Sequence, residues 1–281
     1  MIIDLHTHFL DGKKHLMPTL VDDMSRCCIN TNIWQYSEAA YLEATAAADR
    51  CVVFGLRAKK TGWDVPNEFV ADFVRRHSEK YIYFASIDPS EADHMDQLHR
   101  EVEVNGAKGV KLGPVYQGIH PLDDGYRGIY AYCEQNGLPI MTHMATTFAS
   151  GVPLEYARPI HMDAVACEYP QLKIVLAHLG HPWSTEALSI IRKQKNVYAD
   201  LSALYYRPWQ FYQTMLLAAE YCCGDKIFFG SDYPATTTRS SLDGIRGVND
   251  VIADTNLPRV PMEMIEGIIH RDSLGELGID A

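Results

Sequence analysis

The chain has 281 residues, of which 47% are hydrophobic, and a formal net charge of −11 from 25 Lys and Arg against 36 Asp and Glu. This is the composition of an ordinary globular protein. The negative charge argues against a main role in binding nucleic acid or an anionic membrane surface, because both attract basic proteins. No apolar run approaches the roughly 20 residues of a membrane-spanning helix.

The cellular location is expected to be cytoplasmic. The first residues carry no basic segment followed by a long apolar one, so they do not resemble a secretory signal. The seven cysteines lack the C-x-x-C spacing of redox or zinc-knuckle motifs. We therefore expect reduced thiols.

Short runs of β-branched and other apolar residues alternate with stretches of helical periodicity. Eight runs occur, at residues 2–5, 51–56, 81–87, 107–112, 138–142, 174–177, 197–201 and 227–230. Continuous apolar strands indicate a parallel sheet covered by helices on its faces. The pattern predicts an α/β protein with a (β/α)8 TIM-barrel fold and a single domain over residues 1–281. An open doubly wound sheet is the alternative, but no G-x-G-x-x-G motif follows a strand.

Four segments complete the predicted barrel. Residues 11–34 contain Pro18 and little clear periodicity, so an extended active-site loop is expected there, followed by a helix near residues 37–50. Helical patterns at residues 242–252 and 261–277 would close the outer ring.

Polar residues end five of the eight runs, where a parallel barrel gathers its functional groups. His6 and His8, two residues apart on a strand, point to the same side and could bind one metal ion. Five further polar residues each follow an apolar run, where an unpaired polar group would be costly to bury. They are Lys111, His143, His178, His181 and Asp232.

Four of these strand ends resemble the amidohydrolase superfamily. They are Asp4-Leu-His6-Thr-His8, His143, the sequence Ala-His-Leu-Gly-His-Pro-Trp at residues 177–183, and Gly230-Ser-Asp232-Tyr-Pro. The resemblance spans residues 2–234. It is strongest to the amidohydrolase-related branch, which contains lactonases, hydrolases of ring-cleavage products, non-oxidative decarboxylases and a hydratase.

The resemblance implies roles for these residues. His6, His8, His143 and Asp232 would hold one divalent metal ion, with Zn²⁺ first and Mn²⁺ second. Asp232 would also be the general base for an activated water molecule, and His178 would polarise or protonate the substrate. Neutral imidazoles with one carboxylate suit either metal, and a bound metal ion lowers the pKa of water.

Further residues are candidates for substrate binding. Lys111 would face the substrate or make a structural ion pair. Several arginines follow strands at positions where a carboxylate would find a bidentate partner, which favours an anionic small-molecule substrate. The full set of expected substrate-binding residues is Lys111, His181, Arg57, Arg158, Arg207 and Tyr233.

The leading functional hypothesis is a metal-dependent hydrolase of a small cyclic ester or amide, such as a carboxylated lactone. A non-oxidative decarboxylase or hydratase of an aromatic-derived acid in the same site is the alternative. A non-catalytic, ligand-binding barrel is a third hypothesis from another class. A homo-oligomer is possible, and neither nucleic acid nor a membrane is an expected partner.

Overall fold

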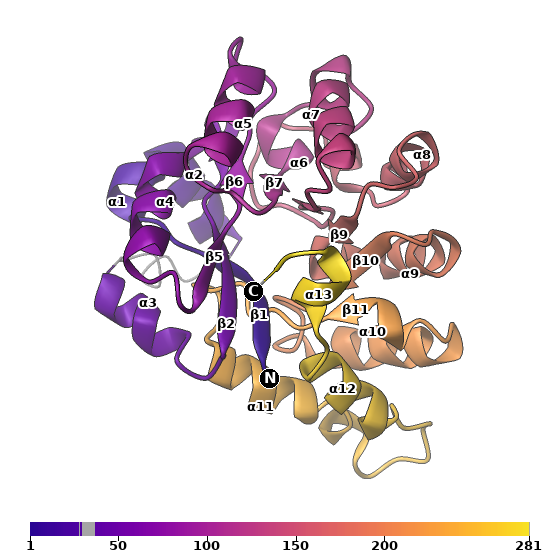
Figure 1. The fold of residues 1–281 in the computed structure, drawn as a ribbon. Coiled ribbons are helices and arrows are strands. Elements are labelled where there is room, and N and C mark those ends of the chain that lie inside the picture. The colour runs from indigo at the N-terminus through magenta and orange to yellow at the C-terminus, as the bar shows by residue number, and fades with distance from the viewer. Residues whose placement is uncertain (28, 30–36, 281) are drawn as a thin grey trace.

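The structure is a computed structural model that describes residues 1–27, 29 and 37–280. The strands of the central sheet occupy the middle of Figure 1, and helices surround them. These strands are β1 (Ile3–His8), β2 (Arg50–Phe54), β5 (Tyr81–Tyr83), β6 (Ala85–Ser86), β7 (Val110–Leu112), β8 (Ile140–Thr142), β9 (Ile174–Leu176), β10 (Val197–Asp200) and β11 (Ile227–Phe228). A short antiparallel hairpin, β3 (Arg57–Ala58) with β4 (Trp63–Asp64), follows β2.

The helices lie mostly between successive strands. They are α1 (Gly12–His15), α2 (Pro18–Arg26), α3 (Glu38–Ala44), α4 (Asn67–Arg76), α5 (His94–Glu103), α6 (Pro114–Gln117), α7 (Asp124–Gln135), α8 (His161–Glu168), α9 (Ser184–Lys193), α10 (Pro208–Glu220), α11 (Thr238–Arg246), α12 (Met262–Ile269) and α13 (Ser273–Leu277). Short 3₁₀ helices are η2 (Lys59–Thr61), η3 (Leu154–Ala157), η4 (Ala177–Gly180), η5 (Gly224–Lys226) and η6 (Asp250–Ile252). Among the described residues, no helix combines the length and the apolar character needed to cross a membrane.

The central strands are parallel and form two runs of neighbours, β1-β2-β5 and β6-β7-β8-β9-β10-β11. Phe84 alone separates β5 from β6 and links the two runs. Its amide donates to the carbonyl oxygen of Val53 at 3.0 Å, whereas the amide of Ala85 donates to that of Gly109 at 3.0 Å. One predicted strand therefore changes neighbours half-way and serves both runs.

The first and last strands also meet. The amide of Leu5 donates to the carbonyl oxygen of Phe229 at 3.1 Å, and the amide of His8 donates to that of Tyr233 at 2.8 Å. With β5 and β6 counted as one strand, the described chain forms the predicted eight-stranded (β/α)8 barrel. Closure of a parallel sheet removes its exposed edges.

An irregularity in β1 determines which of its side chains face the barrel interior. The register between β1 and β2 shifts between Asp4 and Thr7, so β1 contains one extra residue there. Leu5 belongs to the interior cluster, and His6 also faces inward, toward Asp200. Asp4 and Thr7 face outward instead, toward α11 and α3. A bulge of this kind turns a side chain to the opposite face of the sheet.

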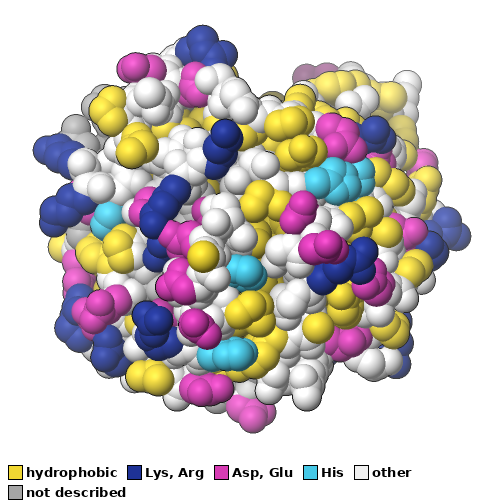
Figure 2. Space-filling model, turned by 90° about the horizontal axis from the view of Figure 1, so that it is seen from above, with side chains coloured by type: hydrophobic (Ala, Val, Ile, Leu, Met, Phe, Trp, Pro, Cys, Tyr) yellow, Lys and Arg dark blue, Asp and Glu magenta, His cyan; other side chains and the backbone are white. Residues whose placement is uncertain are grey.

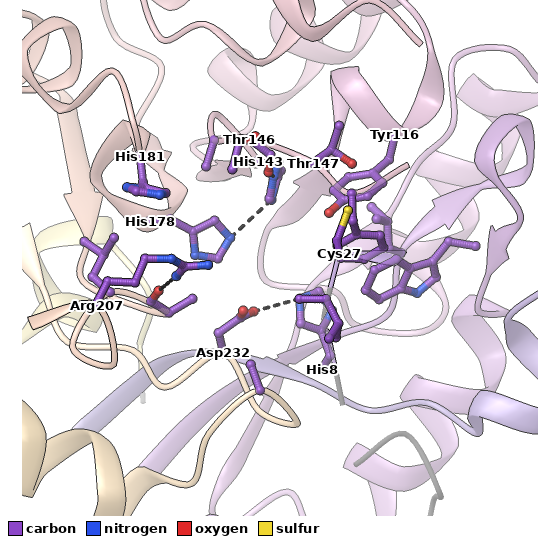
Figure 3. Close-up of a pocket in the computed structure, with 18 of the residues that line it drawn as sticks. His8, Cys27, Tyr116, His143, Thr146, Thr147, His178, His181, Arg207 and Asp232 are labelled. Atoms are coloured by element: carbon purple, nitrogen blue, oxygen red, sulfur yellow. Dashed lines mark hydrogen bonds and ion pairs between the residues drawn. The ribbon is translucent and has the colours of Figure 1, made fainter. Parts of the chain in front are cut away.

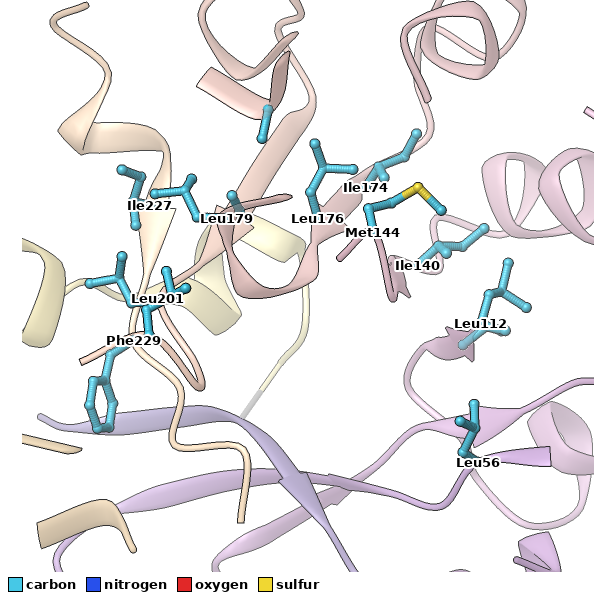
Figure 4. Close-up of a cluster of buried hydrophobic side chains, with 14 of the residues drawn as sticks. Leu56, Leu112, Ile140, Met144, Ile174, Leu176, Leu179, Leu201, Ile227 and Phe229 are labelled. Atoms are coloured by element: carbon cyan, nitrogen blue, oxygen red, sulfur yellow. The ribbon is translucent and has the colours of Figure 1, made fainter. Parts of the chain in front are cut away.

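The hydrophobic core has two parts, one on each face of the sheet. The larger part fills the space between strands and helices, and Figure 4 shows side chains from it, including Leu112, Ile140 and Ile174. The smaller part fills the barrel interior with residues such as Val52, Val175 and Phe228, and it continues into α13. Because each face of the sheet packs against one part of the core, the strands are apolar on both faces.

The structure of residues 11–34 differs from the extended loop that the sequence predicted. The structure forms α1 and α2 within this region, and Leu20 and Met24 of α2 are buried one helical turn apart. Asp11 caps α1, and Pro18 occupies the first turn of α2, where its missing amide hydrogen costs nothing. Residues 28 and 30–34 of the expected loop lie outside the described residues.

Candidate active site

His6, His8 and Asp232 converge at the carboxyl ends of β1 and β11. The Nε2 atoms of His6 and His8 are 3.3 Å apart, and Asp232 Oδ1 lies 3.2 Å from His6 Nε2 and 3.3 Å from His8 Nε2. Two ligand atoms of a tetrahedral ion with bonds of ~2.0–2.1 Å lie roughly 3.3 Å apart. The three separations therefore match the ligand spacing of such an ion.

His143 and His178 form the adjacent part of the cluster. The Nε2 atom of His178 is 3.2 Å from Nδ1 of His143, and Figure 3 shows both rings at the cavity that Asp232 and His8 also line. One ligand atom each of His6, His178 and Asp232 lies within 4.8 Å of the others. The structure thus brings the predicted metal ligands and His178 together, with His143 linked through His178.

A buried layer behind these rings fixes where their protons lie. Asp200 Oδ2 accepts from Nδ1 of His6 at 3.0 Å, and Ser202 donates its hydroxyl to Asp200. His178 Nδ1 lies 3.1 Å from the carbonyl oxygen of Ser202 and 2.8 Å from its Oγ. Because these partners accept hydrogen bonds, each of the two rings is assigned the tautomer with its hydrogen on Nδ1. The Nε2 atom of His178 then presents a lone pair to the cavity, and that of His6 does so when its ring is neutral.

The same reasoning applies to His143, whose Nε2 lies 3.2 Å from the carbonyl oxygen of Thr146 and so donates to it. Its Nδ1 lone pair then faces the Nε2 lone pair of His178. The Asp232 carboxylate is an acceptor as well. Acceptors that face one another at this distance need a positive charge between them, and a divalent metal ion fits that requirement. The described residues therefore form a candidate metal-binding site.

The pKa values follow from burial and from neighbouring charges. Burial lowers the pKa of His8 to about 3 and that of His178 to about 4. Burial and the charge of Lys111 lower the pKa of His6, but the Asp200 and Asp232 carboxylates outweigh them and the pKa is raised overall. Burial raises the pKa of Asp232, yet His178, His6 and His8 hold it well below the usual value. Asp232 is therefore ionised, and His8 and His178 are neutral, at neutral pH.

Lys111 is a buried cation beside the cluster. Its Nζ lies 3.3 Å from His6 Nε2 and 4.5 Å from the centre of the Phe54 ring. Burial lowers the pKa of Lys111 to about 8, although Asp200 and Asp232 raise it. Lys111 thus lines the cavity as an ammonium group at neutral pH.

The local backbone is unusual at three strand ends. In the described part of the chain, five non-glycine residues have a positive φ, and four of them follow β9, β10 and β11: His178, Leu179, Ala203 and Asp232. Such conformations cost free energy and concentrate at functional sites. The amide of Asp232 donates to the carbonyl oxygen of His6 at 2.8 Å, which holds its side chain beside the imidazoles.

The cavity has a volume of about 340 Å³ and a largely apolar wall. Its lining includes the metal-site residues His8, His143 and Asp232, together with Lys111 and His178. Aromatic and aliphatic side chains form much of the remaining wall: Leu56, Trp63, Tyr116, Phe148, Leu204 and Tyr206. Tyr116 packs edge-on against His143, with ring centroids 4.9 Å apart. The cavity therefore places apolar surface beside the polar cluster.

The predicted substrate-binding residues separate into two groups. Arg207 and His181 line the cavity, as Figure 3 shows, and Arg207 lies over the ring of Tyr206 with its guanidinium carbon 4.6 Å from the centroid. Burial, together with the charge of Arg207, lowers the pKa of His181 to about 4. Arg207 is therefore the member of the predicted arginine set that the structure brings to the cavity.

The other predicted residues are engaged elsewhere. Arg57 makes hydrogen bonds of 2.8 Å to both carboxylate oxygens of Glu91, and Arg158 pairs with Glu186. Tyr233 borders a separate hollow beside α3 and packs against Tyr41. None of these three is among the residues that line the described cavity.

Sequence reasoning missed two residues, Asp200 and Ser202, that fix the imidazole rings. Both lie at the carboxyl end of β10, and neither is exposed to solvent. A signal for them was present, because Asp200-Leu-Ser202 ends the seventh apolar run with polar residues, as the other site residues end theirs. Buried carboxylates that orient metal-ligating imidazoles are a common feature of metal sites.

Comparison with known proteins places this geometry in a family. The sequence model described as Amidohydrolase matches residues 3–260. The chain belongs to the amidohydrolase family. The resemblance noted in the sequence is confirmed. The expectation of an enzyme of the amidohydrolase superfamily is also confirmed, which contradicts the hypothesis of a non-catalytic barrel. No curated protein matches the chain.

Solved structures share the fold of this amidohydrolase over nearly its whole length. An uncharacterised TIM-barrel protein from Bordetella bronchiseptica has 22% identity and a TM-score of 0.74, with 99% of each chain covered. A dihydroxybenzoic acid decarboxylase from Polaromonas, with bound manganese and the inhibitor 2-nitroresorcinol, has 13% identity and a TM-score of 0.65, covering 99% of this chain and 96% of its own. A probable 2-pyrone-4,6-dicarboxylic acid hydrolase from Acinetobacter baumannii, with citric acid bound, has 15% identity and a TM-score of 0.62, with 99% of each chain covered.

Proposed function

We propose that this amidohydrolase is a metal-dependent, non-oxidative decarboxylase of a small aromatic-derived carboxylic acid. The observation that carries the proposal is the cavity. Its apolar, aromatic wall meets an ionised Asp232 and imidazoles whose lone pairs face inward. The wall suits a flat ring, the cations Lys111 and Arg207 in the same cavity suit its carboxylate, and the similar fold of decarboxylases supports the proposal.

His6, His8, His143 and Asp232 would hold one divalent metal ion. Three imidazoles with one carboxylate suit Zn²⁺, and the manganese in the Polaromonas decarboxylase makes Mn²⁺ the second choice. When bound, the ion supplies positive charge that holds the oxygens of the substrate and stabilises negative charge formed in the reaction. Asp200 and Ser202 keep the His6 and His178 rings in the tautomer that leaves their Nε2 atoms free of protons.

The remaining site residues act on the substrate directly. Asp232 takes a proton from an ionisable group of the substrate or from water and returns it to the ring carbon as the bond to the carboxyl carbon breaks. The products are the ring compound and CO₂. Arg207 and Lys111 would pair with the carboxylate before it leaves. The apolar wall excludes water and favours conversion of a charged carboxylate into neutral CO₂.

Hydrolysis of a carboxylated lactone is the second candidate. The ionised Asp232 favours it, because a general base beside the metal site could deprotonate water, and the fold is shared with a probable hydrolase. The orientation of His178 is less favourable to hydrolysis. Its Nδ1 hydrogen points to Ser202, and its pKa of about 4 leaves no proton on Nε2 to polarise a carbonyl group.

The test is a product analysis in D₂O with two substrate panels. One panel contains hydroxybenzoic acids labelled with ¹³C at the carboxyl carbon, and the other contains carboxylated lactones and pyrones. We expect release of ¹³CO₂ and one deuterium on the ring carbon that held the carboxylate. Asp232→Asn serves as the inactive control.

Formation of a ring-opened acid without CO₂ would instead establish the hydrolase. Elemental analysis of the dialysed protein, beside the His6→Ala/His8→Ala double variant, identifies the metal. We expect the double variant to hold about one equivalent of Zn or Mn less than the wild type.

A further inference from the structure

A second group of metal-ligating side chains lies outside the cavity, where the chain leaves β7 and β8. His120 follows α6, Glu155 belongs to η3, and His161 begins α8. One ligand atom of each residue lies within 4.8 Å of the others. We propose that these three residues, the rim cluster, form a second metal site that binds Zn²⁺ or a similar transition-metal ion.

The distances within the rim cluster are close to those of a coordinated ion. His161 Nε2 lies 2.7 Å from Glu155 Oε1, and His120 Nε2 lies 3.7 Å from Glu155 Oε2. The two imidazole rings have centroids 4.4 Å apart at an angle of 64°. Ligand atoms of one zinc ion lie roughly 3.3 Å apart, so side-chain movements of about 1 Å would bring the three ligand atoms to one ion.

The donor set and the exposure of the rim cluster point to a transition metal. Two imidazoles and one carboxylate are typical ligands of Zn²⁺, whereas Mg²⁺ and Ca²⁺ prefer oxygen ligands. The His161 side chain is 15% exposed, but that of Glu155 is 50% exposed. One side of the group is therefore buried against the protein and the other is open to water, which would be the fourth ligand.

The protons of the rim cluster can be displaced at small cost. His161 Nε2 is directed at Glu155, both at its carboxylate and at its carbonyl oxygen, so its hydrogen occupies the place that an ion would take. The Leu122 amide donates to His120 Nδ1 at 3.2 Å. Leu122 is exposed, so water can replace that partner when His120 binds an ion through Nε2. Binding would release protons, as at other imidazole sites.

Exposed histidines alone would not make such a site. Figure 2 shows histidine side chains at several places on one face of the molecule, some of them beside acidic residues. The rim cluster differs because two imidazoles share one carboxylate. A useful contrast is His77, whose Nε2 lies 3.0 Å from Glu38 Oε1, because the second partner of that carboxylate is Arg76 and not a histidine.

An ion in the rim cluster would join two connections of the barrel. Residues 118–123 follow α6, and residues 143–160 follow β8. The second connection carries Thr146, Thr147 and Phe148, which line the cavity. The ion would therefore fix one wall of the substrate cavity without contacting the substrate.

The test is equilibrium dialysis of the full chain against Zn²⁺ at about 10 µM, followed by elemental analysis. Wild type is compared with His161→Gln and with the control His77→Gln. We expect wild type and His77→Gln to bind one equivalent more than His161→Gln. Equal stoichiometry in wild type and His161→Gln would overturn the proposal.

Two further measurements separate the rim cluster from the active site. In the His6→Ala/His8→Ala variant, one equivalent should remain, and adding His161→Gln should remove it. Glu155→Gln, which keeps the size of the side chain, should weaken Zn²⁺ binding at least tenfold. Binding that disappears in His6→Ala/His8→Ala but persists in Glu155→Gln would contradict the second site, provided that circular dichroism shows both proteins folded.

Discussion

At the scale of single residues, the site depends on where a few protons lie. Asp200 and Ser202 accept hydrogen bonds from Nδ1 of His6 and His178, and the carbonyl oxygen of Thr146 accepts one from Nε2 of His143. The inward-facing nitrogens are then acceptors beside the Asp232 carboxylate. The residues that accept these hydrogen bonds thus determine that the inward-facing ligand atoms are acceptors, and such a set of atoms favours a bound cation.

We expect Asp232→Asn to lower kcat by about 10²–10⁴, because an amide cannot transfer the proton. The substitution suits the backbone, since Asp232 has φ of 62° and Asn adopts this left-handed conformation readily. The metal-free variant should therefore still fold. Steady-state assays and thermal unfolding measure the two effects.

The control for this prediction is Asp254→Asn, at an exposed carboxylate just after η6. It should leave kcat unchanged. Near-full activity of Asp232→Asn in a folded, metal-loaded protein would rule out the proposed proton transfer.

The buried histidines predict an acid-sensitive fold in the metal-free protein. Burial lowers the pKa of His8 to about 3, and the pKa values of His178 and His181 to about 4, from an ordinary value of 6.5. Between pH 6.5 and 4 the unfolded chain therefore binds more protons than the folded one. The free energy of unfolding should fall as the pH falls through this range.

Urea unfolding at pH 7 and pH 5 in EDTA tests this effect. His181→Gln removes one of these imidazoles, which is half-buried, and should show a smaller loss of stability between the two pH values than wild type. The exposed His99→Gln is the control and should behave as wild type. An identical loss in His181→Gln would mean that this imidazole does not contribute.

At the scale of elements, the connections after the strands decide which predicted residues reach the cavity. Arg207 immediately precedes α10 and lines the cavity, whereas Arg158 lies just before α8 and pairs with Glu186. Two arginines at equivalent places in the sequence thus have different surroundings. Their effects on substrate binding should differ accordingly.

Arg207→Met should raise KM for a carboxylated substrate by about tenfold or more, because it removes a charged hydrogen-bond donor from the cavity. Arg158→Met is the matched control. It removes a partly exposed ion pair, which contributes about 0–1 kcal/mol, and should leave KM unchanged. If both variants raise KM equally, neither arginine binds the substrate through direct contact.

The strands could be predicted from the sequence because each is apolar on both faces, and all eight predicted runs overlap observed strands. The helices α1 and α2 could not, because α1 buries only His15, α2 buries only Leu20 and Met24, and Pro18 indicated a break. The bulge in β1 was equally hidden, since its cause is the pairing with β2. The site residues followed from strand ends, whereas their partners Asp200 and Ser202 needed the neighbouring strands in place.

At the scale of the whole molecule, the barrel closes through close backbone contact between its first and last strands. A Cβ atom added to Gly230 would lie 2.8 Å from Cβ of His6 and 3.3 Å from Cβ of Ser202. We expect Gly230→Ala to lower the free energy of unfolding by about 1–3 kcal/mol and to weaken metal binding, because His6 must move. Urea unfolding and metal titration measure both effects.

Gly267→Ala is the control for Gly230→Ala. Gly267 lies in α12 and has nothing within 4 Å of the added Cβ, so alanine should stabilise the helix by about 0.4–1 kcal/mol. Stability of Gly230→Ala equal to that of wild type would show that the first and last strands can separate without cost.

The meeting of the first and last strands also orders events during synthesis on the ribosome. His6 emerges among the earliest residues, but its partner Asp232 follows β11. A nascent chain shorter than about 230 residues would hold three imidazoles without the carboxylate that completes the candidate metal site. Firm retention of a metal ion in the active site would then mark a chain that includes Asp232, and premature release from the ribosome would yield a protein that cannot retain an ion there.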